Sequence, residues 1–229
     1  MVEEAILERT MHGFNPQNIS CIVWAFAVMG YQSEDLFSAA EEQVWKIGLS
    51  GFSDQALVDF LWAFASSDYQ GSNKAKDTFE MVALHLRKRS LQSMDTRQLS
   101  VTAWSFARLG HFLEQPYRVV EKEFMQRGAE SFSPEERYFL LEAFHAYRSN
   151  LPAEPQSPDS CSIGLQVVTA LEGEGGDFDQ APAVTPPRTP PRTSTKSTAE
   201  FTSPGSGRKH KSESGSWARP MVPADRGFD

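Results

Sequence analysis

Large apolar, small and polar residues recur in one fixed order four times within the first 150 residues of the chain. The four copies align without gaps over eighteen residues, as FNPQNISCIVWAFAVMGY, FSDQALVDFLWAFASSDY, MDTRQLSVTAWSFARLGH and FSPEERYFLLEAFHAYRS. They open at Phe14, Phe52, Met94 and Phe132, so their periods are 38, 42 and 38 residues. Self-similarity at such a period is the signature of a repeat architecture.

Each copy begins with the local signals of a helix start. The residue after the opening one has a short polar side chain, which can accept a hydrogen bond from a free N–H of the first turn. A proline follows in the first and fourth copies, at the position where a missing N–H costs nothing. Ser133 and Glu136 have the spacing of a capping box, and Gly30 and Gly110 end their copies as helix-stop residues. The predicted capping residues are Asn15, Ser53, Asp95 and Ser133.

An aromatic pair stands at the centre of the pattern. Ten residues after the opening residue the first three copies have tryptophan and the fourth has Glu142, and two residues later all four copies have phenylalanine. The residue between them is small, which lets a neighbouring helix approach closely while the aromatic rings fill the gaps beside it. We therefore interpret these rings as packing residues. The predicted repeat core is Trp24, Phe26, Trp62, Phe64, Trp104, Phe106 and Phe144.

A second helix is predicted after each of the first three copies, over residues 33–47, 73–89 and 115–127. Residues 2–12 resemble the second helix of an earlier copy, and the fourth copy is expected to lack one. Helix pairs with a period near 40 residues are typical of α-solenoids. The predicted fold is all-α, a right-handed α-solenoid of about four helix-pair repeats. Because it runs from half a copy to half a copy, we expect a fragment of a longer array or a stack that a partner continues.

The composition changes sharply near residue 150. Residues 1–150 hold all five tyrosines and thirteen of the sixteen phenylalanines, whereas the remainder holds eleven of the fourteen prolines. A segment with so few aromatic side chains does not bury enough apolar surface to offset the entropy of ordering. We predict a helical-repeat domain over residues 1–149 and a disordered Pro/Ser/Thr/Gly-rich tail over residues 150–229. Its apolar run 163–171 is interpreted as part of a solvated linker, or else as a docking segment or transient helix.

Charge, hydropathy and motifs exclude several classes of function. The mean hydropathy is −0.43, and no run approaches the roughly 18 apolar residues of a membrane-spanning helix. The two cysteines, Cys21 and Cys161, are too few for a disulfide scaffold or a usual zinc site. The histidine and glycine spacings match no catalytic or phosphate-binding motif. We therefore expect no enzymatic activity, no cofactor and no metal. The acidic amino-terminal sequence has no features of a secretory signal or transit peptide, so we expect the protein to stay in the cytosol or nucleus unless the chain lacks its true start.

Three of the repeated segments are similar to a line that recurs in a known repeat family. ISCIVWAFAVMGY, LVDFLWAFASSDY and LSVTAWSFARLGH resemble the LSNLLWAFAKLG-type line of octotricopeptide-like repeats. These occur in organelle proteins of algae and protists, in FAST-kinase-like and RAP-domain proteins and in the RNA-editing substrate-binding complex 6 domain. The resemblance covers about residues 1–149, and Glu142 and Arg137 depart from it in the fourth copy. It implies a protein that binds single-stranded RNA in a mitochondrion or chloroplast and acts in RNA processing, stability or editing.

The stripe of each first helix least committed to packing is predicted to lie seven and three residues before the tryptophan position and four residues after it. Glutamine and arginine there can read base edges or hold phosphates. Arg97, Arg108 and the 87–89 run form the only convincing basic neighbourhood, unless they are merely solvated or complement a helix C-terminus. Residues 1–150 hold 14 Lys/Arg and 20 Asp/Glu, a net charge of −6, so RNA binding by the chain alone is expected to be weak. The candidate RNA-binding residues are Gln17, Gln55, Ser66, Arg87, Lys88, Arg89, Arg97 and Arg108.

The tail carries a tandem TPPR over residues 185–192. Such a motif suits a polyproline II ligand for an SH3- or WW-type groove. Thr185, Thr189 and Ser203 each precede a proline, as the target sites of proline-directed kinases do. The alternative is a linker without a specific role. These features support a second hypothesis, in which an acidic solenoid surface docks a basic protein partner and the tail recruits a signalling domain.

Overall fold

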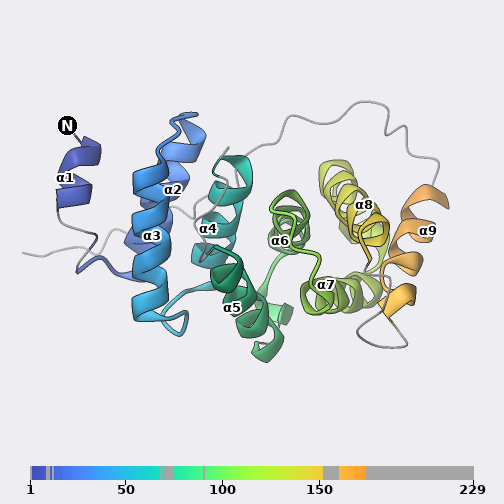
Figure 1. Ribbon diagram of the computed structural model, residues 1–229. Helices are drawn as coiled ribbons and strands as arrows, with labels where there is room; N and C mark the ends of the chain where they lie inside the picture. Colours follow the sequence, from blue (N-terminus) through green and yellow to red (C-terminus); the bar gives the residue numbers. More distant parts are fainter. Residues whose placement is uncertain are drawn as a thin grey trace, which may run out of the picture. The chain divides into compact units, whose positions relative to one another are not determined.

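The computed structural model describes residues 2–8, 11, 13–67, 69, 75–89, 91–151 and 160–173. Over these residues the chain forms nine α-helices, three short 3₁₀-helices and no strand (Figure 1). The all-α prediction is therefore confirmed for the part of the chain that the structure describes. The motif residues Thr185, Thr189 and Ser203 lie outside it.

The helices alternate between two sets. The first helices of the four copies are α2 (Pro16–Val28), α4 (Asp54–Ser66), α6 (Thr96–Arg108) and α8 (Pro134–Ser149). The second helices are α1 (Val2–Glu8), α3 (Glu34–Ile47), α5 (Ala75–Lys88), α7 (Glu114–Arg127) and α9 (Leu165–Gly173). The short helices are η1 (Leu91–Ser93), η2 (Ala129–Ser131) and η3 (Ser160–Ser162). Apart from α9, each helix lies within two or three residues of its predicted start.

The predicted capping residues form the expected hydrogen bonds. Each side chain accepts from the backbone N–H three residues later, at 2.8 Å for Asn15, 3.1 Å for Ser53, 2.7 Å for Asp95 and 3.3 Å for Ser133. The Ser133 capping box forms as predicted, and Asp95 forms a second box that the sequence analysis did not identify. Each such bond satisfies an N–H that has no partner within the helix.

Gly30 and Gly110 end α2 and α6 in the same way. Their φ angles are +65° and +71°, a region that glycine occupies without the steric cost of a Cβ. The N–H of the next residue, Tyr31 or His111, reaches back to the carbonyl of Phe26 or Phe106 at 3.0 and 2.9 Å. This is the Schellman arrangement of a helix end.

Each helix packs against the helix two places along the chain. α2 contacts α4, α4 contacts α6 and α6 contacts α8. Likewise α1 contacts α3, α3 contacts α5, α5 contacts α7 and α7 contacts α9. The core between the two sets is aromatic: the ring centroids of Phe37 and Phe64 are 4.9 Å apart, and those of Phe60 and Phe64 are 4.5 Å apart. The helices α4 and α6 therefore each lie between two other first helices.

The expectation that the fourth copy lacks a second helix is wrong. Helix α9 lies within the segment assigned to the tail and packs against α7 and α8. A hydrogen bond also ties this segment to α7, because the backbone N–H of Gly164 donates to Glu121 Oε1 at 2.8 Å. The apolar run 163–171 is thus part of the packed structure, which extends to residue 173 rather than to residue 149. Its buried side chains are Ile163, Val167, Val168 and Leu171.

Candidate nucleic-acid interface

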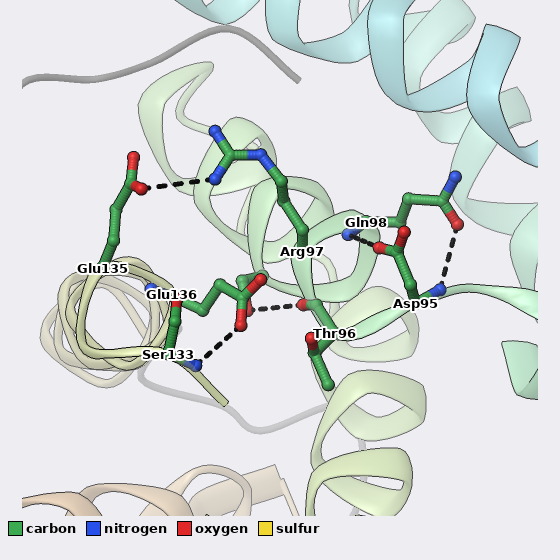
Figure 2. A network of polar contacts seen from close by, with 8 residues as sticks. Asp95, Thr96, Arg97, Gln98, Ser133, Glu135 and Glu136 are labelled. Carbon is green, nitrogen blue, oxygen red and sulfur yellow. Dashed lines mark hydrogen bonds and ion pairs between the residues drawn. The ribbon is translucent and has the colours of Figure 1, made fainter. Parts of the chain in front are cut away.

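Polar side chains from consecutive first helices meet where those helices begin. The residues three after the opening residue are Gln17, Gln55, Arg97 and Glu135, which we call the polar edge. Gln98 Nε2 donates to Gln55 Oε1 at 3.0 Å and links α6 to α4. Arg97 Nη1 lies 3.3 Å from Glu135 Oε2 and links α6 to α8 (Figure 2). Among the four positions the structure therefore joins Arg97 to Glu135, while Gln55 is joined to Gln98, the residue after Arg97.

The capping boxes hold this edge in place. The side chain of Gln98 accepts from the N–H of Asp95 at 3.0 Å while it donates to Gln55, so one residue fixes the start of α6 and its link to α4. Glu136 accepts from the N–H of Ser133 at 2.8 Å and fixes the start of α8. Figure 2 shows the Arg97–Glu135 pair beside these two boxes.

The middle of the predicted stripe is not a surface. Asp59, Val101 and Phe139 are fully or almost fully buried, whereas Cys21 is partly exposed. Because α4 and α6 are covered by first helices on both sides and α8 is covered by α6, the position faces a neighbouring helix. In α4 the buried residues run without a break over residues 56–65.

The far ends of the first helices carry two of the candidate residues. Ser66 and Arg108 are exposed at the carboxyl ends of α4 and α6. The Arg108 guanidinium lies 5.8 Å from the ring centroid of Trp104, a cation–π distance. Arg97 and Arg108 thus lie at opposite ends of α6, about 16 Å apart at a rise of 1.5 Å per residue.

The basic run at the end of α5 divides in the structure. Arg89 Nη1 lies 3.0 Å from Asp54 Oδ1, which places Arg89 at the start of α4, near the polar edge. Arg87 and Lys88 are exposed. The predicted basic neighbourhood is therefore only partly assembled, since Arg89 and Arg97 each pair with a carboxylate and Arg108 lies at the other end of α6.

The repeated tryptophans pack between helices and offer little surface for stacking on bases. Trp62 and Trp104 are buried, and Trp24 is partly exposed. Trp104 Nε1 donates to Glu142 Oε2 at 3.1 Å, and its ring centroid lies 5.6 Å from that of Phe139 on α8. The phenylalanines of the predicted core, Phe26, Phe64, Phe106 and Phe144, are all buried.

A groove of about 480 Å³ between α3 and α5 was missed by the sequence analysis. Trp45 and Leu84 are 49% and 52% exposed there, with Met81 beside them and Asp77, Glu80 and Lys88 among the polar lining. Trp45 lies outside the repeated line, so its position carried no signal in the alignment of copies.

Few ionisable groups are perturbed. Burial raises the pKa of Asp59 to about 6, against the hydrogen bond from Gln55 that lowers it. That bond is 2.7 Å long and reaches Oδ1, while Oδ2 is buried without a hydrogen-bond partner. Burial lowers the pKa of His85. Burial raises the pKa of Glu121, although the hydrogen bond from the backbone N–H of Gly164 acts in the other direction.

The described residues contain no group of three or more side chains placed to hold a metal ion. Among the described helices none has the length and apolar character that crossing a bilayer requires. Comparison with family models, with curated proteins and with solved structures gives no match to this chain.

Proposed function

We propose that this chain is a right-handed α-solenoid of about four helix pairs that acts as a non-catalytic binding module. The packing of each helix on the helix two places along the chain supports this architecture. Stacking of this kind buries apolar faces that one helix pair does not bury alone. The recurring caps and aromatic pairs make consecutive copies equivalent, so their exposed polar residues lie at regular intervals.

We further propose single-stranded RNA in a mitochondrion or chloroplast as the ligand, in keeping with the resemblance to octotricopeptide-like repeats. The observation that carries this proposal is the polar edge, with one polar side chain per copy at equivalent positions. Helical-repeat proteins that recognise RNA place their base-reading side chains in this way. The exposed amide of Gln17 can donate to and accept from a base, and the Arg97 guanidinium can bind a base edge or phosphate. The Gln55 amide can do so by exchanging its bonds to Asp59 and Gln98.

The ion pair at Arg97 does not prevent this role. Arg97 and Glu135 are both partly exposed, and pairs of that kind contribute roughly 0–1 kcal/mol. A phosphate can therefore replace Glu135 as the partner of Arg97. Since residues 1–150 carry 14 Lys/Arg and 20 Asp/Glu, we expect weak binding that falls steeply with salt.

An electrophoretic shift series with the full chain and single-stranded RNA at two salt concentrations tests the proposal. Replacing Arg97 and Arg108 together by Gln should weaken binding about tenfold or more and reduce the slope of log affinity against log salt by about 1–2. The matched control replaces Lys46 and Lys122 by Gln, which removes the same charge from α3 and α7. Equal effects of both pairs would contradict the assignment of Arg97 and Arg108 to the RNA-binding surface.

The second candidate function is a protein-interaction scaffold, and the groove between α3 and α5 favours it. An exposed tryptophan in a groove with both acidic and basic lining residues is typical of protein interfaces. Under this alternative the full chain does not shift RNA even at low salt. Trp45→Ala, rather than the arginine variants, then weakens binding of the protein partner.

A further inference from the structure

Helix α2 leaves partly exposed a face that is buried in the equivalent helices α4, α6 and α8. The residues seven, eight and eleven after the opening residue are partly exposed in the first copy, where they are Cys21, Ile22 and Ala25. The nine equivalent residues of the other copies are no more than 1% exposed. These are Asp59, Phe60, Ala63, Val101, Thr102, Ser105, Phe139, Leu140 and Ala143.

In the later copies this face meets the preceding first helix. Phe139 of α8 faces Trp104 of α6, with ring centroids 5.6 Å apart, and Gln98 of α6 reaches back to Gln55 of α4. The face of α2 at the same repeat positions is called the upstream face. It is formed by Asn18, Cys21, Ile22, Ala25 and Met29. Asn18 is exposed, and Met29 is 68% exposed.

The composition of the upstream face is that of an interior contact. Ala25 is the counterpart of Ala63, Ser105 and Ala143, the small residues at which neighbouring helices approach closely. Ile22 adds an apolar side chain next to it. A face with this size pattern fits another helix of the repeat, because helix packing depends on small residues that admit the ridge of a neighbour.

The opposite face of α8 has a different composition. The positions six and thirteen after the opening residue hold serine, valine or alanine in the first three copies, whereas in α8 they are Tyr138 and His145, with Leu141 at position nine between them. Glu142 replaces the tryptophan, and His145 Nε2 lies 3.1 Å from Glu172 Oε1 of α9. This face is bulky and polar, so it is a poor match for the upstream face of α2 in a second copy of the chain.

We propose that the upstream face of α2 is a stacking interface for the first helix of a further helix pair of this repeat type. That helix presents small residues at the positions of Ser100, Ala103 and Ala107 and a tryptophan at the position of Trp104. The argument rests on continuity with the α2–α4, α4–α6 and α6–α8 contacts. It stands whether or not the solenoid binds RNA.

A fusion at the amino terminus tests the proposal. Residues 94–119 joined directly to Val2 add the first helix of copy three with the spacing of 38 residues that separates Met94 from Phe132. Cys161→Ser leaves Cys21 as the only thiol of the chain. We expect maleimide to label Cys21 at least tenfold more slowly in the fusion than in the unfused chain, and the thermal transition to rise.

The matched control is the same fusion in which the added copy carries Ser100→Tyr, Ala103→Leu and Ala107→His, the residues of copy four at these positions. It should label at the rate of the unfused chain. Ala25→Trp gives a second test: it should leave the stability of the unfused chain unchanged and abolish protection in the fusion.

Equal labelling of Cys21 with and without the added helix would overturn the proposal. So would an unfused chain that sediments as a dimer with Cys21 already protected, because a second copy would then cover the face. An Ala25→Trp change that destabilises the unfused chain would also contradict it, since the face would then be covered within the chain.

Discussion

Trp104 Nε1 donates a hydrogen bond of 3.1 Å to Oε2 of Glu142, the residue that occupies the tryptophan position of the next copy. The corresponding indole nitrogens of Trp24 and Trp62 are buried without a hydrogen-bond partner. The departure of the fourth copy from the repeat therefore supplies an acceptor to the last tryptophan of the first helices.

Glu142→Leu should lower the free energy of unfolding by about 1–2 kcal/mol, because it leaves the buried Trp104 N–H without an acceptor. Glu142→Gln keeps a side-chain oxygen and should cost under about 0.5 kcal/mol. Urea unfolding followed by tryptophan fluorescence measures both, with Glu130→Gln at an exposed position as the control. Equal losses for the leucine and glutamine variants would show that the hydrogen bond does not stabilise the fold.

Asp59 should make the stability depend on pH. Burial raises its pKa to about 6 from an ordinary value of 3.8, so between these values the folded state holds the proton more tightly than the unfolded state. The contribution of Asp59 to stability is then fully present below pH 4 and is lost as the pH rises to about 6. We expect Asp59→Asn to stabilise the chain at pH 7.5 by about 1–2 kcal/mol and to remove this dependence.

Urea unfolding of the Asp59→Asn variant at pH 4.5 and pH 7.5 checks that expectation. Asp35→Asn, at an exposed position on α3, is the control for the loss of one charge. If the stabilisation is the same at both pH values, the carboxylate is not the group that titrates.

Two leucines of α9 give a test of its packing. Leu171 is fully buried and Leu165 is 50% exposed on the same helix. Leu171→Ala should lower the free energy of unfolding by about 2–4 kcal/mol, because it leaves a cavity between α9 and its neighbours. Leu165→Ala should change it by under about 0.5 kcal/mol. Thermal unfolding measures both, and similar melting temperatures would mean that α9 does not contribute to the cooperative unit.

The sequence predicted the local features well because their causes are local. The caps at Asn15 and Ser53 and the helix end at Gly30 depend on side chains and backbone within one turn. The burial of Asp59 depends on both neighbours of α4, and a single-helix pattern does not show how many sides of a helix are covered. The packing of Leu171 depends on a surface that α7 and α8 create far upstream. The groove at Trp45 likewise requires the placement of α5 beside α3.

Glu135 provides the sharpest separation of the two proposed functions. It pairs with Arg97 across 3.3 Å, so Glu135→Gln takes this carboxylate away from the guanidinium and removes a negative charge from the polar edge. If RNA binds there, affinity should rise about three- to tenfold at low salt, because Arg97 no longer exchanges a carboxylate for a phosphate and the polar edge repels phosphate less. Glu130→Gln removes the same charge at η2 and should raise affinity less. An unchanged affinity in both variants, measured by electrophoretic shift with the full chain, would place any RNA contact elsewhere and favour the scaffold.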